Sequence, residues 1–248
     1  MTKVSLVIPV YNYASKISQT IDTIQDHCKS KDGWEIIFVD DGSTDNTVDI
    51  IETKIKNQRM RILKQPSNQG KGAAVRRGLM ESKGLYRVFT DCDLAYDLKQ
   101  VDKVVAALEN GADVAYADRT HPLSNCIVES GAESYQSKRN IMSYVLRKMI
   151  RGAGVKNVGD TQAGLKGFKG DVAHIIPLSK INGFPFDIEL LVIAQVNKLK
   201  LESVPVEYHI EDAPSTVVPQ KVVVDFLKSI AKIRSNKLRG LYRAKDTR

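Results

Sequence analysis

Two aspartates one residue apart, Asp91 and Asp93, are the residues of this sequence best suited to chemistry; they lie in the stretch VFTDCDLAYD over residues 88–97. They stand at the end of YRVFTD (86–91), a segment whose pattern predicts a strand. Aspartates at such a point either form turns and helix caps or bind a hard divalent cation through oxygen. Two carboxylates this close repel each other unless a cation lies between them, so the pairing favours a metal site.

Strand-like and helix-like segments alternate on both sides of this pair. Short runs rich in β-branched residues predict strands, and segments with apolar residues at helical spacing predict helices. The predicted strands are 4–10, 35–41, 59–63, 86–91 and 112–117, and the predicted helices are 14–28, 43–56, 70–82 and 97–109. This alternation predicts βαβ units in a mostly parallel central sheet, and therefore a single α/β domain over residues 1–218.

Polar groups follow several of these strands. The first strand leads into Tyr11 and Asn12, the second into Asp41, and the fourth into Asp91 and Asp93. Ligands of such sheets bind beyond the carboxyl ends of the strands, so these side chains should gather at one edge. Mg²⁺ or Mn²⁺ there would take one or two carboxylates and complete its shell with substrate phosphates.

The bulk composition indicates an intracellular globular protein. The 248 residues are enough for one large domain, and the three cysteines are an odd number without close spacing, which fits a reducing cytoplasm better than a disulfide framework. We see no signal peptide and no apolar stretch near the roughly 20 residues that a membrane span needs. The expected location is the cytoplasm, peripheral to the cytoplasmic face of a membrane.

The membrane part of this expectation comes from the last 30 residues. Residues 221–248 contain nine Lys or Arg and two Asp, whereas the rest of the chain is nearly neutral. Apolar residues recur at helical spacing through the segment: Val223, Phe226, Leu227, Ile230 and Ile233, with Leu238 and Leu241 on a second, rotated stripe. We predict a basic amphipathic helix or tail over 219–248, which either lies on a membrane surface or docks on the domain.

The order of the motifs carries a resemblance to a known family. VSLVIPVYN, FVDDGSTDNT, NQGKGAAVRRG and TDCDLA follow one another at spacings that fit successive strand ends. The chain resembles the family-two glycosyltransferases, which have the Rossmann-like GT-A fold, from about Val4 to Tyr208. GDTQAGLKGF (159–168), FPFDIELL (184–191) and SVPVEYH (203–209) are similar to motifs of the dolichyl- or polyprenyl-phosphate sugar synthases. The DLA after Asp93 and the segment ADRTHPLS (117–124) resemble the glucosyl branch more than the mannosyl branch.

This resemblance implies roles for individual residues. Metal binding falls to Asp91 and Asp93, and catalysis to Asp93, Asp160 and Asp187. The residues that the resemblance assigns to the nucleotide-sugar are Pro9, Tyr11, Asp41, Lys71, Asp91, Gln162 and Glu189. Arg119, Arg139 and Ser143 resemble residues that hold an acceptor phosphate, and Arg139 and Ser143 would share one helix face.

The implied reaction is an inverting transfer of a sugar, with glucose favoured, from a nucleotide-sugar to a polyprenyl phosphate. UDP-glucose is the favoured donor and GDP-mannose a possible one. A phosphate acceptor is already anionic and needs no strong general base. An alternative is a saccharide or protein hydroxyl acceptor, which would need a base such as Asp187 or Asp160. A basic nucleic-acid-binding protein would rest on the tail alone, so we expect no nucleic-acid partner.

Two departures from the family pattern affect the site. Ala95 stands where mannosyl relatives often carry a glutamine ligand, and Tyr13 stands where many relatives have an acidic residue. The sequence lacks the Q-x-x-R-W motif of processive, polymer-making members of the family, which argues against chain polymerisation. The segment over residues 119–134 is expected to be a long polar loop.

Overall fold

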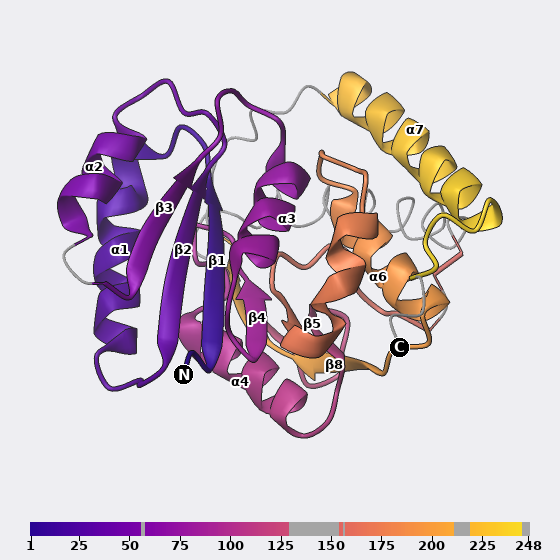
Figure 1. The fold of residues 1–248 in the computed structure, drawn as a ribbon, viewed down its shortest axis with the longest axis horizontal. Helices are drawn as coiled ribbons and strands as arrows, with labels where there is room; N and C mark the ends of the chain where they lie inside the picture. The colour runs from indigo at the N-terminus through magenta and orange to yellow at the C-terminus, as the bar shows by residue number, and fades with distance from the viewer. Residues whose placement is uncertain (56–57, 129–153, 156, 211–218, 245–248) are drawn as a thin grey trace.

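The computed structural model describes residues 1–55, 58–128, 154–155, 157–210 and 219–244. Its centre is a seven-stranded sheet with the order β3-β2-β1-β4-β7-β5-β8 (Figure 1). The strands of this sheet are β1 (Val4–Val10), β2 (Trp34–Asp40), β3 (Met60–Lys64), β4 (Tyr86–Phe89), β5 (Val114–Asp118), β7 (Lys166–Lys169) and β8 (Leu201–Pro205). Neighbouring strands are parallel except β7, which runs antiparallel to both β4 and β5. The predicted mostly parallel α/β sheet is confirmed.

Helices cover both faces of the sheet. On one face, α1 (Ala14–Cys28), α2 (Thr47–Lys54) and α4 (Leu98–Glu109) bury their apolar sides in one core cluster. On the other face lie α3 (Lys71–Glu81), the 3₁₀ helix η1 (Gly170–Leu178), α6 (Phe186–Val196) and α7 (Pro219–Leu238). The central strands are buried on both sides, which explains why β1 reads VSLVIPV, apolar at every position except Ser5, and not as an alternating pattern.

Pro9 is tolerated in the central strand β1 because of the register. The pairing of β1 with β4 ends at Val7, so Pro9 lies beyond the end of that ladder, while its pairing with β2 continues to Val10. A proline cannot donate to a ladder, and it therefore belongs where one side of the strand is already unpaired. This frees the last residues of β1 to lead directly into the site.

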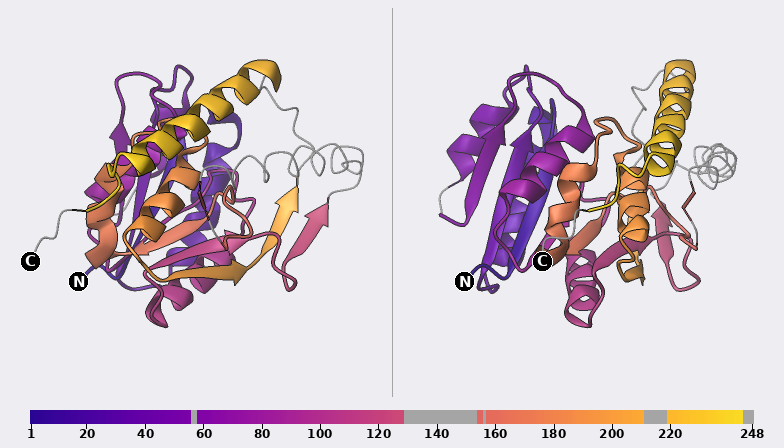
Figure 2. Two further views of the ribbon diagram at one scale, coloured as in Figure 1. Left: turned by 90° about the vertical axis from the view of Figure 1, so that its right-hand side faces the viewer. Right: turned by 45° about the vertical axis from the view of Figure 1, so that its right-hand side comes forward.

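The expectation for residues 119–134 is wrong in part. Within that segment, β6 (Asn125–Val128) pairs in parallel with β9 (Glu207–Ile210), and residues 129–134 lie outside the described residues. This two-stranded sheet projects from the main body (Figure 2). The local pattern could not predict β6, because a four-residue strand with a polar start is specified by its partner, more than 80 residues later in the chain.

The C-terminal helix α7 is docked on the domain by its apolar stripe. Phe226, Ile230 and Ile233 are buried in the cluster that includes α6, whereas Leu238 and Leu241 are exposed. Residues 239–244 turn back onto the domain, where the Tyr242 hydroxyl is fully buried. Of the two alternatives for this stripe, docking is the one the structure adopts. The predicted domain boundary at residue 218 adjoins 211–218, outside the described residues, and stays a prediction.

Among the described residues, no helix combines the length and the hydropathy that a membrane-crossing segment requires.

Candidate functional site

The loops after β1 and β2 are tied together at the carboxyl edge of the sheet. Asn12, in the left-handed conformation with φ 48°, accepts a hydrogen bond from the Thr44 backbone N–H at 2.8 Å. Its own backbone N–H donates to Ser43 Oγ at 2.9 Å. Tyr11, beside it, is 45% exposed, and Pro9 is buried in β1. The two predicted donor-binding loops therefore form one surface from which the Tyr11 ring projects.

Asp41 organises the path from this surface to α3. Its carboxylate accepts hydrogen bonds from Gln65 Nε2 at 2.6 Å and from the backbone N–H groups of Gln69 and Gly70 at 2.8 Å each. The side chain is almost fully buried. Asp41 thus fixes the loop that ends at Lys71, the first residue of α3, and its predicted contact with the nucleotide stays a prediction.

The glycines around Lys71 allow a close approach of two loops. A Cβ on Gly70, which has φ 99°, would lie 2.5 Å from the Asn182 carbonyl oxygen. A Cβ on Gly72 would lie 2.6 Å from the Ile181 carbonyl oxygen. The Gly72 N–H donates to Asn182 O at 2.7 Å. The G-K-G sequence therefore lets the N-terminus of α3 lock against residues 181–182 and holds Lys71 in place.

Lys71 meets the aspartate pair. Its Nζ lies 2.6 Å from Asp91 Oδ1, and 5.9 Å from the ring centroids of both Phe184 and Phe186. Burial lowers the pKa of Lys71, but the negative charges of Asp91, Asp187 and Asp93 outweigh burial and raise it above its ordinary value. Lys71 is therefore a permanent cation facing three carboxylates.

A second lysine, Lys166, holds Asp187. Lys166 is fully buried at the start of β7, and its Nζ donates to Asp187 Oδ1 at 2.8 Å and to the Ala163 carbonyl at 2.6 Å. Burial raises the pKa of Asp187, and the ammonium groups of Lys166 and Lys71 oppose that rise. The sequence prediction did not include Lys166, although a lone lysine inside the apolar stretch LKGF was the available signal.

Asp160 and Arg119, predicted for different roles, form one ion pair. Arg119 donates to Asp160 through Nε and, at 2.9 Å, through Nη2. Burial alone would raise the pKa of Asp160, but the hydrogen bonds and charge of Arg119 hold it below its ordinary value. The charge of Lys166 acts in the same direction on Asp160. The Gln162 backbone N–H also donates to Asp160, at 3.0 Å, so Asp160 fixes the loop that carries Gln162.

These pairs form a row of alternating charge across the site. In order, the row contains Arg119, Asp160, Lys166, Asp187, Lys71 and Asp91. Asp93 stands at its open end, partly out in solvent. The structure therefore brings together the three predicted catalytic aspartates, Lys71 and Arg119.

Glu189, predicted to bind the donor, has a structural role in this geometry, and its contact with the donor stays a prediction. It is completely buried, and its carboxylate accepts from Ser179 Oγ, from the N–H groups of Lys180 and Ile181, and from the Tyr242 hydroxyl at 2.6 Å. Four internal donors hold this carboxylate in place. Glu189 thereby joins the loop at 179–181, which packs on α3, to the C-terminal segment.

The other two predicted acceptor-binding residues, Arg139 and Ser143, lie outside the described residues.

The chemistry of Asp91 and Asp93 fits a divalent cation that shares its ligands with a substrate. Among the described residues, no group of three or more His, Cys, Asp or Glu side chains is arranged to hold a metal. Two carboxylates are nevertheless the number that Mg²⁺ usually takes from a protein when substrate phosphates complete its shell. A Cβ on Gly164 would lie 2.0 Å from Asp91 Oδ2, so the glycine makes room for this carboxylate.

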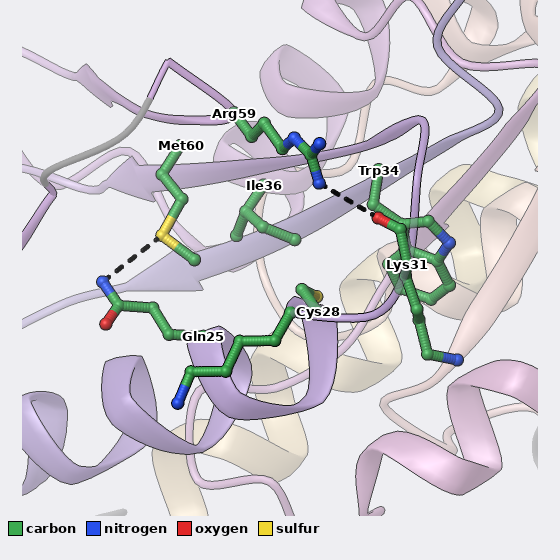
Figure 3. Close-up of a pocket in the computed structure, with 8 residues that line it drawn as sticks. Gln25, Cys28, Lys31, Trp34, Ile36, Arg59 and Met60 are labelled. Atoms are coloured by element: carbon green, nitrogen blue, oxygen red, sulfur yellow. Dashed lines mark hydrogen bonds between the residues drawn. The ribbon is translucent and has the colours of Figure 1, made fainter.

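A hollow of about 370 Å³ lies elsewhere, near the starts of β2 and β3 (Figure 3). Lys31, Trp34, Arg59 and Met60 line it, and Arg59 Nη1 donates to the Lys31 carbonyl oxygen at 3.3 Å. It contains none of the predicted site residues and lies at the amino ends of the strands. In parallel α/β sheets ligands bind at the carboxyl ends, so this hollow is not the candidate site.

Comparison with known proteins agrees with the motifs and the fold. The model of the family "Glycosyl transferase family 2" matches residues 5–170. A dolichyl-phosphate beta-glucosyltransferase of Saccharomyces cerevisiae is 31% identical over 96% of this chain and 76% of its own length. The protein of the same name from Dictyostelium discoideum is 30% identical over 98% of this chain and 77% of its length, and that from Homo sapiens is 28% identical over 99% and 79%. These names support the glucosyl branch over the mannosyl one.

Solved structures support the GT-A fold. Glucosyl-3-phosphoglycerate synthase from Mycobacterium tuberculosis, in complex with Mn²⁺ and UDP-glucose, superimposes with a TM-score of 0.62 at 19% identity, covering 99% of this chain and 81% of that one. Its complex with Mn²⁺, UDP and glucosyl-3-phosphoglycerate gives a TM-score of 0.60 at 20% identity, covering 99% and 82%. With the motifs in order and the aspartate pair at the end of β4, the chain belongs to glycosyl transferase family 2 and is a glycosyltransferase.

Proposed function

We propose that this protein transfers glucose from UDP-glucose to dolichyl phosphate or a similar polyprenyl phosphate, with inversion, at the cytoplasmic face of a membrane. One observation carries the proposal: the chain is 31% identical to a dolichyl-phosphate beta-glucosyltransferase. The site agrees with it, because Asp91 and Asp93 face Lys71 at the sheet edge where donors of such folds bind. Inversion of an α-linked donor gives a β-linked product, which agrees with the names of the relatives.

Asp91 and Asp93 would hold the divalent cation, Mg²⁺ or Mn²⁺, against the donor diphosphate. Bound there, the cation supplies a Lewis acid that neutralises charge on the departing nucleotide. Lys71 contributes a second, fixed positive charge at the same place, since three carboxylates keep it protonated. Tyr11 and the loop that Asp41 organises would hold the nucleoside part, and Gln162 would contact the sugar.

Arg119 would orient the acceptor phosphate, together with Arg139 and Ser143. The bidentate bond to Asp160 holds the Arg119 side chain in one orientation, which reduces the entropy lost when an anion binds. Asp160 thereby acts as a positioning residue. Its lowered pKa makes it a weak proton acceptor, which suits an acceptor that arrives ionised.

A second candidate is transfer to a saccharide or protein hydroxyl, and Asp187 is the observation that favours it. A hydroxyl must lose its proton to a general base, and a base works best when its pKa lies near the operating pH. Burial raises the pKa of Asp187 towards that range. Asp187 would be the base in this case, whereas transfer to a phosphate needs none.

The test compares two acceptors that differ only in the phosphate. Purified protein would receive labelled UDP-glucose, Mn²⁺, and either a short polyprenyl phosphate or the matching polyprenol in detergent. Label in the phosphate-bearing lipid, and none in the alcohol, is the expected result. Equal label in both lipids would favour the second candidate. So would label that appears only when a saccharide replaces the lipid and that Asp187→Asn abolishes.

A further inference from the structure

The helix α7 carries a second apolar stripe on a different side from its docked one. Val224, Leu227 and Leu238 are 49%, 42% and 80% exposed, and Ala231 is exposed between them. Positions 224, 227, 231 and 238 follow helical spacing and share one face, rotated by more than a quarter turn from the buried Phe226, Ile230 and Ile233. Leu241, half exposed, follows just beyond the helix. Single exposed apolar residues are ordinary, but four apolar residues along one helix face indicate a contact surface.

Basic residues border this outer stripe. Arg234 lies along one side of it, and Lys228 and Lys232 lie along the other, all three exposed. Arg239 and Arg243 follow at the C-terminal end, also exposed. Asp225 is the one acidic residue between positions 221 and 244. An apolar stripe between rows of cations is complementary to a bilayer with anionic headgroups, where lysine and arginine meet phosphates and the apolar side chains enter the acyl boundary.

The position of α7 suits such a contact. Its first turns lie at the end of the molecule to which the parallel strands point, and the helix then runs back along α6 (Figures 1 and 2). Because the candidate donor site is at the carboxyl ends of those strands, the start of α7 and that site lie towards the same end of the molecule. The donor itself is water-soluble, so a peripheral contact is sufficient for a reaction with an embedded acceptor.

We propose that the outer face of α7, formed by Val224, Leu227, Ala231 and Leu238 and bordered by Lys228, Lys232 and Arg234, binds the surface of an anionic lipid bilayer. Of the apolar residues that the sequence pattern emphasised, Phe226, Ile230 and Ile233 are buried against the domain, and the proposal assigns lipid binding to the exposed Leu227 and Leu238 together with Val224 and Ala231. The proposed function supplies the reason for membrane binding, which is access to a lipid acceptor. The binding itself can be measured without any substrate.

The first test is flotation with vesicles of phosphatidylcholine, alone or with roughly 30% phosphatidylserine, since anionic lipid should strengthen the contact. The full chain should float with the anionic vesicles. Leu227→Asp should lower its partition about tenfold, because it places a charge in the apolar stripe. Leu85→Asp is the matched control: Leu85 is 46% exposed but stands just before β4, at the opposite end of the sheet, and this variant should float like the wild type.

A second pair of variants tests the basic residues that border the outer stripe. The double variant Lys228→Gln and Lys232→Gln should bind anionic vesicles about thirtyfold more weakly, because each of the two cations near an anionic surface strengthens binding about fivefold. Lys29→Gln removes a cation that is also exposed, beside Asp26 at the end of α1, and should not change flotation. Higher salt should reduce the difference between the two variants.

Three results would overturn the proposal. The first is a wild type that does not float. The second is a loss of flotation in Leu85→Asp equal to that in Leu227→Asp. The third is a wild type that forms a dimer in solution which Leu227→Asp dissociates, because the stripe would then bind a second copy of the chain.

Activity separates this proposal from the proposed function. If both are correct, Leu227→Asp keeps the wild-type rate with a short lipid phosphate in detergent and is slower with acceptor embedded in vesicles. If flotation depends on Leu227 but no lipid phosphate is ever glucosylated, the membrane surface is supported and the proposed function fails.

Discussion

The smallest unit of this site is the buried pair of Lys166 and Asp187. Neither side chain touches solvent appreciably, and the pair lies between the ion pair of Asp160 and the aspartate pair after β4. A buried charge without its partner is costly, so Lys166 determines whether Asp187 can stay ionised in the proposed donor site.

Replacing Lys166 by Met should destabilise the protein by about 3 kcal/mol, the usual loss when one member of a buried pair is removed. This loss of stability should depend on pH. The pKa of Asp187 in the folded protein already lies above its unfolded value, and removing Lys166, which opposes that rise, raises it further. The folded variant then keeps a proton that the unfolded chain releases, so its stability falls as pH rises through the folded pKa.

Urea unfolding at about pH 5 and about pH 8 measures this effect, with the larger loss expected at the higher pH. Adding Asp187→Asn to Lys166→Met removes the ionisable group and should remove the difference between the two pH values. If the single variant loses the same free energy of unfolding at both pH values, Lys166 is not what keeps Asp187 ionised.

Replacing Tyr242 by Phe tests the structural role of Glu189. The change removes the hydroxyl that donates to Glu189 Oε1 at 2.6 Å and leaves a buried carboxylate oxygen short of one donor. The free energy of unfolding should fall by about 1–3 kcal/mol. The KM for the donor should not change, and a several-fold rise in KM without loss of stability would instead return Glu189 to the donor pocket.

At the scale of elements, the site depends on how closely α3 approaches the loop before α6. Gly72→Ala would place a Cβ 2.6 Å from both the Ile181 carbonyl oxygen and Phe186 Cβ, so backbone must shift and Lys71 moves with it. We expect a loss of stability of about 2 kcal/mol and a loss of activity at the temperature where the variant is still folded. Thermal unfolding and donor KM are the measurements.

Gly183→Ala is the control in the same loop. A Cβ on Gly183 would meet only Pro185 Cδ, at 3.8 Å, which is an ordinary contact. This variant should match the wild type in both measurements. If it is as damaging as Gly72→Ala, the loop tolerates no substitution and the close approach at Gly72 has no special role.

Element patterns predicted the first half of the fold well. The strand predicted at 4–10 has the bounds of β1, and those predicted at 35–41 and 59–63 are shifted by one residue from β2 and β3. These strands are buried on both faces and alternate with amphipathic helices, so local sequence is sufficient to identify them. Because parallel strands end at one edge, the positions of Asp41, Asp91 and Asp93 followed as well.

What the patterns could not predict are contacts between distant segments. The strand β7 enters the sheet between β4 and β5 although it lies some 50 residues after β5, and it runs antiparallel to both. This insertion carries Lys166 to Asp187, and nothing local specifies it. The pairing of β6 with β9 and the bond from Tyr242 to Glu189 are missing from the sequence prediction for the same reason.

For the whole molecule, the proposed donor and cation should act together on stability. A ligand at about 100 times its Kd stabilises the folded state by about 2.7 kcal/mol, which corresponds to a rise in Tm of about 5 °C for a chain of this size. UDP with Mn²⁺ should produce such a shift, and UDP alone a smaller one. Asp93→Asn should abolish the part that depends on Mn²⁺, and a full shift in this variant would contradict a metal role for Asp93.

The most direct test of the central claim is the rate of glucose transfer from UDP-glucose to polyprenyl phosphate during a titration with Mn²⁺, for the wild type and two matched variants. Asp93→Asn should be slower by about 100-fold, or about 3 kcal/mol of transition-state stabilisation, because it weakens the cation site at the departing diphosphate. Asp32→Asn, at a fully exposed aspartate near the opposite end of the sheet, should equal the wild type. Transfer by Asp93→Asn at the wild-type rate and with the same response to Mn²⁺ would contradict the account.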